Sequence, residues 1–145
     1  MMKKIKIISF FILLLNIHNY SYAENNFFEE GKKKYNEKKL DESKFMFQRS
    51  IVFNPKDSKS YLYLARIYNK EKNLKEEEKN LRTVLLLDPS NEEATYMVIK
   101  IELKKSNYSK VKELTNTFVK ICKTLCEKEK SILKSLKDLE PKNES

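Results

Sequence analysis

The residues able to do chemistry in this chain are its carboxylates, two cysteines and one histidine, His18. His18 follows an apolar run near the N-terminus, and we expect this N-terminal segment to be removed from the protein. The processed chain then has no histidine for general acid–base catalysis or for metal ligation. Gly31 is the only glycine, so the chain cannot build a glycine-rich loop around a phosphate.

The carboxylates occur in runs, Glu76 to Glu78 and Glu92 with Glu93. Charge runs of this kind usually lie on solvated helix faces, and we expect these carboxylates to lie there too. We expect no catalytic residue, no cofactor and no metal site, and the sequence indicates that the protein is not an enzyme.

Cys122 and Cys126 are four positions apart. In an oxidising compartment a disulfide between them is the expected state, with a bend at residues 123–125, because a regular helix places such a pair awkwardly. Closing so short a loop contributes about 2 kcal/mol at most. The alternatives are two reduced thiols, a redox-active pair, or an incomplete metal site.

The N-terminal segment has the order of a secretory signal peptide. Lys3, Lys4 and Lys6 precede an apolar run, and residues 21–23 form a small-x-small cleavage site. The run is shorter than the roughly 20 residues that a spanning helix needs, although an uncleaved anchor remains the alternative. Cleavage after Ala23 removes three lysines and no acidic residue, so the net charge falls from +9 to about +6.

A 34-residue period organises the rest of the chain. Pro55 and Pro89 are 34 residues apart, and Leu40, Leu74 and Tyr108 repeat at the same spacing. This period is typical of helix-turn-helix solenoids. Helices are expected over 24–37, 41–53, 58–71, 75–87, 92–105 and 108–122, with a capping helix at about 124–139 whose apolar residues mark one face. Each proline ends the helix before it, and Ser90 with Glu93 predicts a capping box.

The middle unit resembles the tetratricopeptide repeat family. Counting Ser58 as position 1, it carries the expected pattern in Tyr61, Leu64, Ala65, Tyr68, Leu74, Leu81, Val84 and Pro89, with Glu77 in place of the usual alanine. The resemblance covers residues 24 to 122 and degrades in the third unit. It implies an all-α, right-handed solenoid of antiparallel helix pairs with about seven helices. The expected division is a signal peptide (1–23), three repeats (24–57, 58–91 and a degenerate 92–123), a capping helix (124–140) and a tail (141–145).

The resemblance also implies where a ligand binds, because the first helix of each unit lines the concave surface in that family. The corresponding residues here form a basic column beside an apolar and aromatic one: Phe28, Lys32, Tyr35, Leu62, Arg66, Asn69, Lys70, Tyr96, Lys100, Leu103 and Lys104. The family's carboxylate clamp, which grips a chain terminus, needs lysine and asparagine where this chain has Phe28 and Lys32.

These features predict an exported adaptor, periplasmic or extracellular, that binds a protein or peptide with acidic groups in its concave groove. Two alternatives stay open: a binder of an anionic polymer or membrane surface, and an accessory subunit of an envelope assembly that docks by its end or convex face. Export and the mixing of lysine with glutamate argue against nucleic acid. A shallow dependence of binding on salt distinguishes a peptide ligand from a polyanion.

Overall fold

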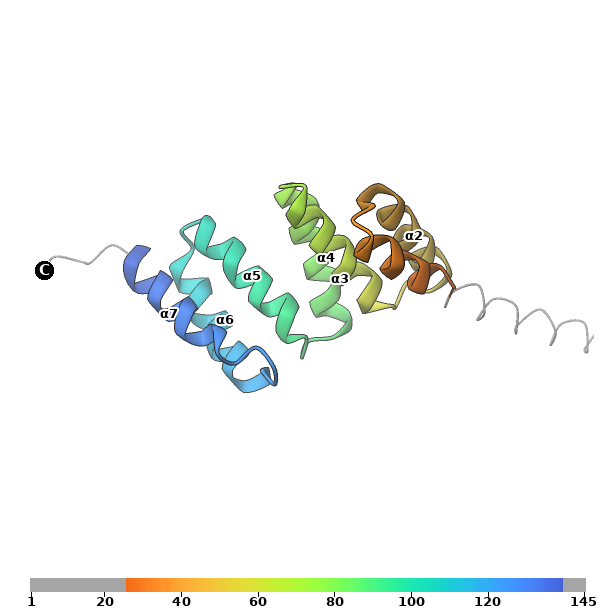
Figure 1. Ribbon diagram of the computed structural model, residues 1–145. Helices are drawn as coiled ribbons and strands as arrows, with labels where there is room; N and C mark the ends of the chain where they lie inside the picture. Colours follow the sequence, from red (N-terminus) through yellow and green to blue (C-terminus); the bar gives the residue numbers. More distant parts are fainter. Residues whose placement is uncertain (1–25, 140–145) are drawn as a thin grey trace, which may run out of the picture. The chain divides into compact units, whose positions relative to one another are not determined.

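The structure is a computed structural model that describes residues 26–139, and every regular element in that range is an α-helix (Figure 1). A helix over residues 26–36 comes first. It is followed by α2 (Leu40–Phe53), α3 (Ser58–Lys70), α4 (Leu74–Leu87), α5 (Glu92–Lys104), α6 (Tyr108–Ile121) and α7 (Lys128–Leu139). The prediction of an all-α chain is confirmed. The predicted signal peptide and the tail at 141–145 lie outside the described residues.

The 34-residue period fixes where the helices begin. Helices α2, α4 and α6 begin at Leu40, Leu74 and Tyr108, the three positions that repeat in the sequence. The last helix departs from expectation, since α7 begins at Lys128 rather than at 124. Among residues 26–139 no helix is long and apolar enough to cross a membrane.

The turns inside the helix pairs also repeat at this period. Lys38, Lys72 and Ser106 have φ values of 63°, 58° and 57°, in the left-handed region that favours glycine. At the second turn, the Lys72 N–H donates to Asn69 O at 3.1 Å and the Asn73 N–H donates to Tyr68 O at 2.9 Å. This pattern satisfies carbonyls at the end of α3 and turns the chain into α4.

The N-terminus of α5 is capped differently from the prediction. Asn91 is the capping residue, and its side chain accepts from the Ala94 N–H at 3.0 Å. The Ser90 hydroxyl instead donates to Asp88 at 2.9 Å. The predicted capping box between Ser90 and Glu93 is therefore wrong, because asparagine caps one residue later and Glu93 is used elsewhere.

The chain divides into two compact units, up to Ser60 and from Tyr61 onward. In the first unit, Phe47 of α2 is fully buried and its ring lies 5.8 Å from that of Phe28. Gly31 faces Phe47 so closely that an added Cβ would lie 2.8 Å from the ring. The Ser43 hydroxyl donates to Gly31 O at 2.9 Å. The single glycine thus allows the two helices to approach closely.

The second unit has a core in two neighbouring groups. One packs α3, α4 and α5 through Leu62, Ala65, Leu81, Val84, Ala94 and Ile101. The other packs α5, α6 and α7 through Ile99, Val111, Phe118, Ile132 and Leu136. Ile132 and Leu136 bury one face of α7, while Leu133 and Leu139 on the same helix stay about half exposed. Helix α7 therefore covers the apolar side of the α5–α6 pair with a single stripe.

The expectation that the acidic runs lie on solvated surface is wrong for Glu77. Its side chain is only 3% exposed and accepts from the Asn69 amide at 2.8 Å. Glu77 occupies the family's alanine position, which faces the partner helix, and the Asn69 amide compensates the loss of hydration.

Candidate functional site

The predicted ligand residues of the first unit already have partners. The Phe28 ring packs on Phe47, and Lys32 Nζ lies 5.5 Å from the Phe28 ring centroid. Lys32 Nζ also lies 3.0 Å from Glu29 Oε2. Tyr35 is half-buried. The positive charge of Lys32 is thus balanced within its own helix.

The predicted residues of α3 serve mainly the fold. Leu62 is 9% exposed and belongs to the core. Arg66 donates from Nε to Glu93 Oε1 at 2.6 Å, and a second bond joins its Nη2 to Glu93 Oε2. This bond to Glu93 raises the pKa of the Arg66 guanidinium further above its ordinary value. Lys70 is exposed.

Asn69 lies in a hollow at the C-terminal ends of α3 and α5 and the N-terminal end of α4. This hollow has a volume of about 300 Å³ and is lined by Asn69, Lys72, Leu74, Glu77 and Lys104. The Asn69 amide is held by Glu77, as described above. Lys104 is the positively charged side chain that α5 contributes to this hollow.

The predicted residues of α5 come together in one cavity. Helices α5 and α7 are in direct contact (Figure 1). A cavity of about 360 Å³ between them is lined by Tyr96, Lys100, Leu103 and Lys104. Helix α7 supplies the opposite wall with Ser131, Ile132, Ser135 and Leu139. The α7 residues were absent from the prediction, because an end helix was expected only to shield the core.

The charges of this cavity are uncompensated in the described structure. Lys100 and Lys104 are both exposed, and within residues 26–139 neither forms an ion pair. Lys100 Nζ lies 5.8 Å from the Tyr96 ring centroid. Because the two lysines are four residues apart on one helix, their ammonium groups lie on the same face. The cavity thus combines an apolar floor with two available cations.

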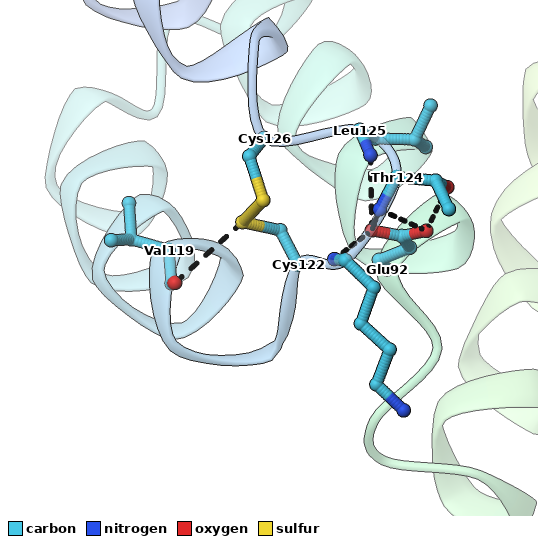
Figure 2. Close-up of a disulfide and its surroundings, with 7 residues drawn as sticks. Glu92, Val119, Cys122, Thr124, Leu125 and Cys126 are labelled. Atoms are coloured by element: carbon cyan, nitrogen blue, oxygen red, sulfur yellow. Dashed lines mark hydrogen bonds between the residues drawn. A yellow bond between two sulfur atoms is a disulfide. The ribbon is translucent and has the colours of Figure 1, made fainter.

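The link between α6 and α7 forms a second notable feature (Figure 2). Cys122 and Cys126 form a disulfide with their Cα atoms 5.3 Å apart. Lys123 and Thr124 are bent, so the predicted bend is present. Among residues 26–139 no group of His, Cys, Asp and Glu is suited to hold a metal ion.

Glu92, in the first turn of α5, holds this link from the other side. Its Oε2 accepts from the backbone N–H groups of Lys123 at 2.6 Å, Thr124 at 3.0 Å and Leu125 at 3.2 Å. Its Oε1 accepts from the Thr124 hydroxyl. The bond from this hydroxyl, followed by those from the backbone, lowers the pKa of Glu92 to about 2. Sequence reasoning missed this role because the donors lie more than 30 residues downstream.

Comparison with known proteins shows which folds this arrangement of helices is similar to. The sequence profile of the tetratricopeptide repeat family matches residues 46–79, and comparison with curated proteins gives no significant match. The Arabidopsis OM64 TPR domain superposes with a TM-score of 0.72 at 15% identity, covering 82% of this chain and 98% of that one.

Two further solved structures are similar. The first TPR of Spaghetti (RPAP3), bound to the HSP90 peptide SRMEEVD, gives a TM-score of 0.71 at 16% identity, covering 82% of this chain and 94% of that one. The Yersinia enterocolitica type III secretion chaperone SycD, in complex with a peptide of the translocator YopD, gives 0.68 at 12% identity, covering 79% and 90%. The fold is an α-solenoid like that of these tetratricopeptide repeat domains, and the family's own profile matches residues 46–79 of this chain.

Proposed function

We propose that the protein is an exported, non-enzymatic adaptor that binds a peptide segment in the cavity between α5 and α7. The ligand is an apolar side chain flanked by carboxylates. The observation that carries this proposal is the pairing of two uncompensated lysines, Lys100 and Lys104, with the apolar surface of Tyr96, Leu103 and Ile132.

The two parts of the cavity have different roles. Burial of a ligand's leucine-sized side chain against the apolar floor contributes about 2 kcal/mol. The lysines attract the flanking carboxylates, which raises the association rate and excludes basic ligands. On the opposite wall, Ser135 offers a hydroxyl to the peptide backbone, whereas the Ser131 hydroxyl donates to Lys128 O at 2.7 Å and can only accept. A cavity of about 360 Å³ suits one or two side chains rather than a folded domain.

Peptide complexes among the structurally similar proteins support this proposal. The RPAP3 domain is bound to a peptide that contains both apolar and acidic residues, and SycD is bound to a translocator peptide. The ligand of this chain is expected to bind at the C-terminal end of the repeats, because Arg66 is already occupied by Glu93.

Export is part of the same proposal. Residues 1–23 have the order of a signal peptide, and the disulfide between Cys122 and Cys126 is of a kind that persists in oxidising compartments. The adaptor would therefore act outside the cytoplasm.

The test is the affinity of a fluorescein-labelled octapeptide in which leucines alternate with glutamates, measured by fluorescence anisotropy. The double variant Lys100→Glu/Lys104→Glu should lose at least about tenfold in affinity, since it replaces two attractions by two repulsions. The matched control is Lys75→Glu/Lys120→Glu, which changes the net charge equally at exposed positions of α4 and α6.

The control variant should bind as the wild type does. Equal losses in the two variants would mean that only overall charge matters, and the site would be wrong. A steep fall of the wild-type affinity with salt would instead favour an anionic polymer as the ligand.

A further inference from the structure

The link between α6 and α7 is fixed outside the helical conformation by two constraints. The disulfide between Cys122 and Cys126 closes a short ring. Glu92 of α5 accepts hydrogen bonds from three successive backbone N–H groups inside that ring (Figure 2). Residues 122–127 therefore stay non-helical between the end of α6 and the start of α7.

The local sequence of this link prefers a helix. Residues 122–127, CKTLCE, contain neither glycine nor proline, and lysine, leucine and glutamate are good helix formers. The side-chain pattern predicts a helix from 124, whereas α7 begins at Lys128. The non-helical state of the link thus depends on the disulfide and on Glu92 rather than on local preference.

The position of α7 depends on this link. Ile132 and Leu136 anchor the helix in the core, and Ser131, Ile132 and Ser135 form one wall of the cavity opposite Lys100. If α7 were extended back to 124, only residues 122 and 123 would remain to connect it with α6. So short a connection would pull α7 away from its present contacts with α5.

We propose that the Cys122–Cys126 disulfide is a redox-sensitive latch that holds α7 where it completes the peptide-binding cavity. This inference rests on the proposed function, because it concerns the regulation of the same cavity. The oxidised protein binds its ligand, and the reduced protein releases it as residues 124–127 become helical. Glu92 alone does not prevent this change, because the N–H groups of Thr124 and Leu125 would lie in the first turn of the new helix, where they have no intrahelical acceptor and can stay bonded to Glu92.

The chemical step is ordinary thiol–disulfide exchange with a dithiol reductant. Cys126 is the exposed member of the pair, so a thiolate of the reductant attacks its sulfur and Cys122 leaves as a thiolate, which takes up a proton. The second thiolate of the reductant then attacks the mixed disulfide and releases Cys126. Two electrons and two protons reach the protein, and the reductant becomes a disulfide.

The test compares the purified exported protein before and after reduction with dithiothreitol. Two quantities are measured: the NMR Cα chemical shifts of residues 123–127, and the affinity for the leucine–glutamate octapeptide. On reduction we expect the shifts of residues 124–127 to move to helical values, and the affinity to fall roughly tenfold, within the usual range of coupling between sites.

Two variants separate the possible failures. Cys122→Ser/Cys126→Ser should bind weakly and ignore the reductant, which excludes a general effect of dithiothreitol. Lys100→Glu/Lys104→Glu should show the same change in chemical shifts, but its affinity should already be at least about tenfold below that of the wild type in the oxidised state.

Three results would overturn the proposal. Unchanged shifts and affinity on reduction would refute the latch and leave the proposed function intact. Changed shifts with constant affinity would refute its role in binding. Absence of binding by the oxidised wild-type protein would refute the proposed function, and the regulation of the cavity with it.

Discussion

Arg66 of α3 and Glu93 of α5 form a two-point ion pair across the second unit, with Nε of Arg66 2.6 Å from Oε1 of Glu93. The two side chains are about one-third exposed. Each residue belongs to a sequence pattern that suggested another role, a ligand contact for Arg66 and a cap for Glu93. The pair instead joins the first helices of two successive repeats.

This pair predicts that Arg66 contributes to stability rather than to ligand binding. Arg66→Ala should lower the free energy of unfolding by about 1 kcal/mol, the upper part of the range for partly exposed pairs, because the geometry is bidentate. Urea denaturation measures the change. The octapeptide affinity of the folded variant should equal that of the wild type, and a loss of affinity would return Arg66 to the binding surface.

The left-handed turns predict stabilising substitutions. Lys72 has a φ of 58° without being glycine, a conformation that costs an L-residue about 1–2 kcal/mol. Lys72→Gly should raise the free energy of unfolding by about 0.5–1 kcal/mol once the greater freedom of glycine in the unfolded chain is subtracted. Thermal denaturation followed by circular dichroism measures it. Lys79→Gly, inside α4, is the control and should destabilise the protein by about 1 kcal/mol.

A larger side chain at Gly31 should lower the stability of the protein, whereas glycine at position 72 should raise it. Gly31→Ala would place a Cβ 2.8 Å from the Phe47 ring, which is fully buried. Overpacking of this kind costs about 1–3 kcal/mol. The measurement is the urea midpoint of unfolding. If Gly31→Ala matched or exceeded the wild type in stability, the close approach of the two helices would be contradicted.

Glu92 predicts a dependence of stability on pH. Its pKa is about 2 in the folded protein and 4.5 in the reference state, so its contribution is fully present above pH 4.5 and is lost as the pH falls toward 2. The difference in stability between the wild type and Glu92→Gln should therefore shrink over that range. Urea denaturation at a series of pH values tests this. A difference that stayed constant down to pH 2 would mean that Glu92 does not hold the link.

A larger side chain in the α7 wall of the cavity should block ligand binding without a change in net charge. Ser135 lines the cavity and is half-buried, so Ser135→Phe should fill the space and abolish binding of the octapeptide. Ser109→Phe is the matched control, since Ser109 is an exposed residue of α6 outside the cavity. Fluorescence anisotropy gives both affinities. Normal binding by Ser135→Phe would place the ligand elsewhere.

The sequence by itself determined the helices of this protein. Leu40, Leu74 and Tyr108 begin successive second helices, because the period of the apolar residues and the prolines that end the first two repeats are local signals. The sequence also placed Tyr96 and Lys100 on one face of a helix, since that relation depends only on helical geometry.

Only the tertiary structure decided what the charged residues do. Glu77, Glu92 and Glu93 look alike as acidic residues in helix first turns, yet one is buried against Asn69, one holds the link to α7 and one binds Arg66. Their partners lie in other helices or in the α6–α7 link, up to 33 residues away, so no local pattern records them. The start of α7 at Lys128 has the same origin, because a disulfide and a distant carboxylate override the helical preference of the residues before it.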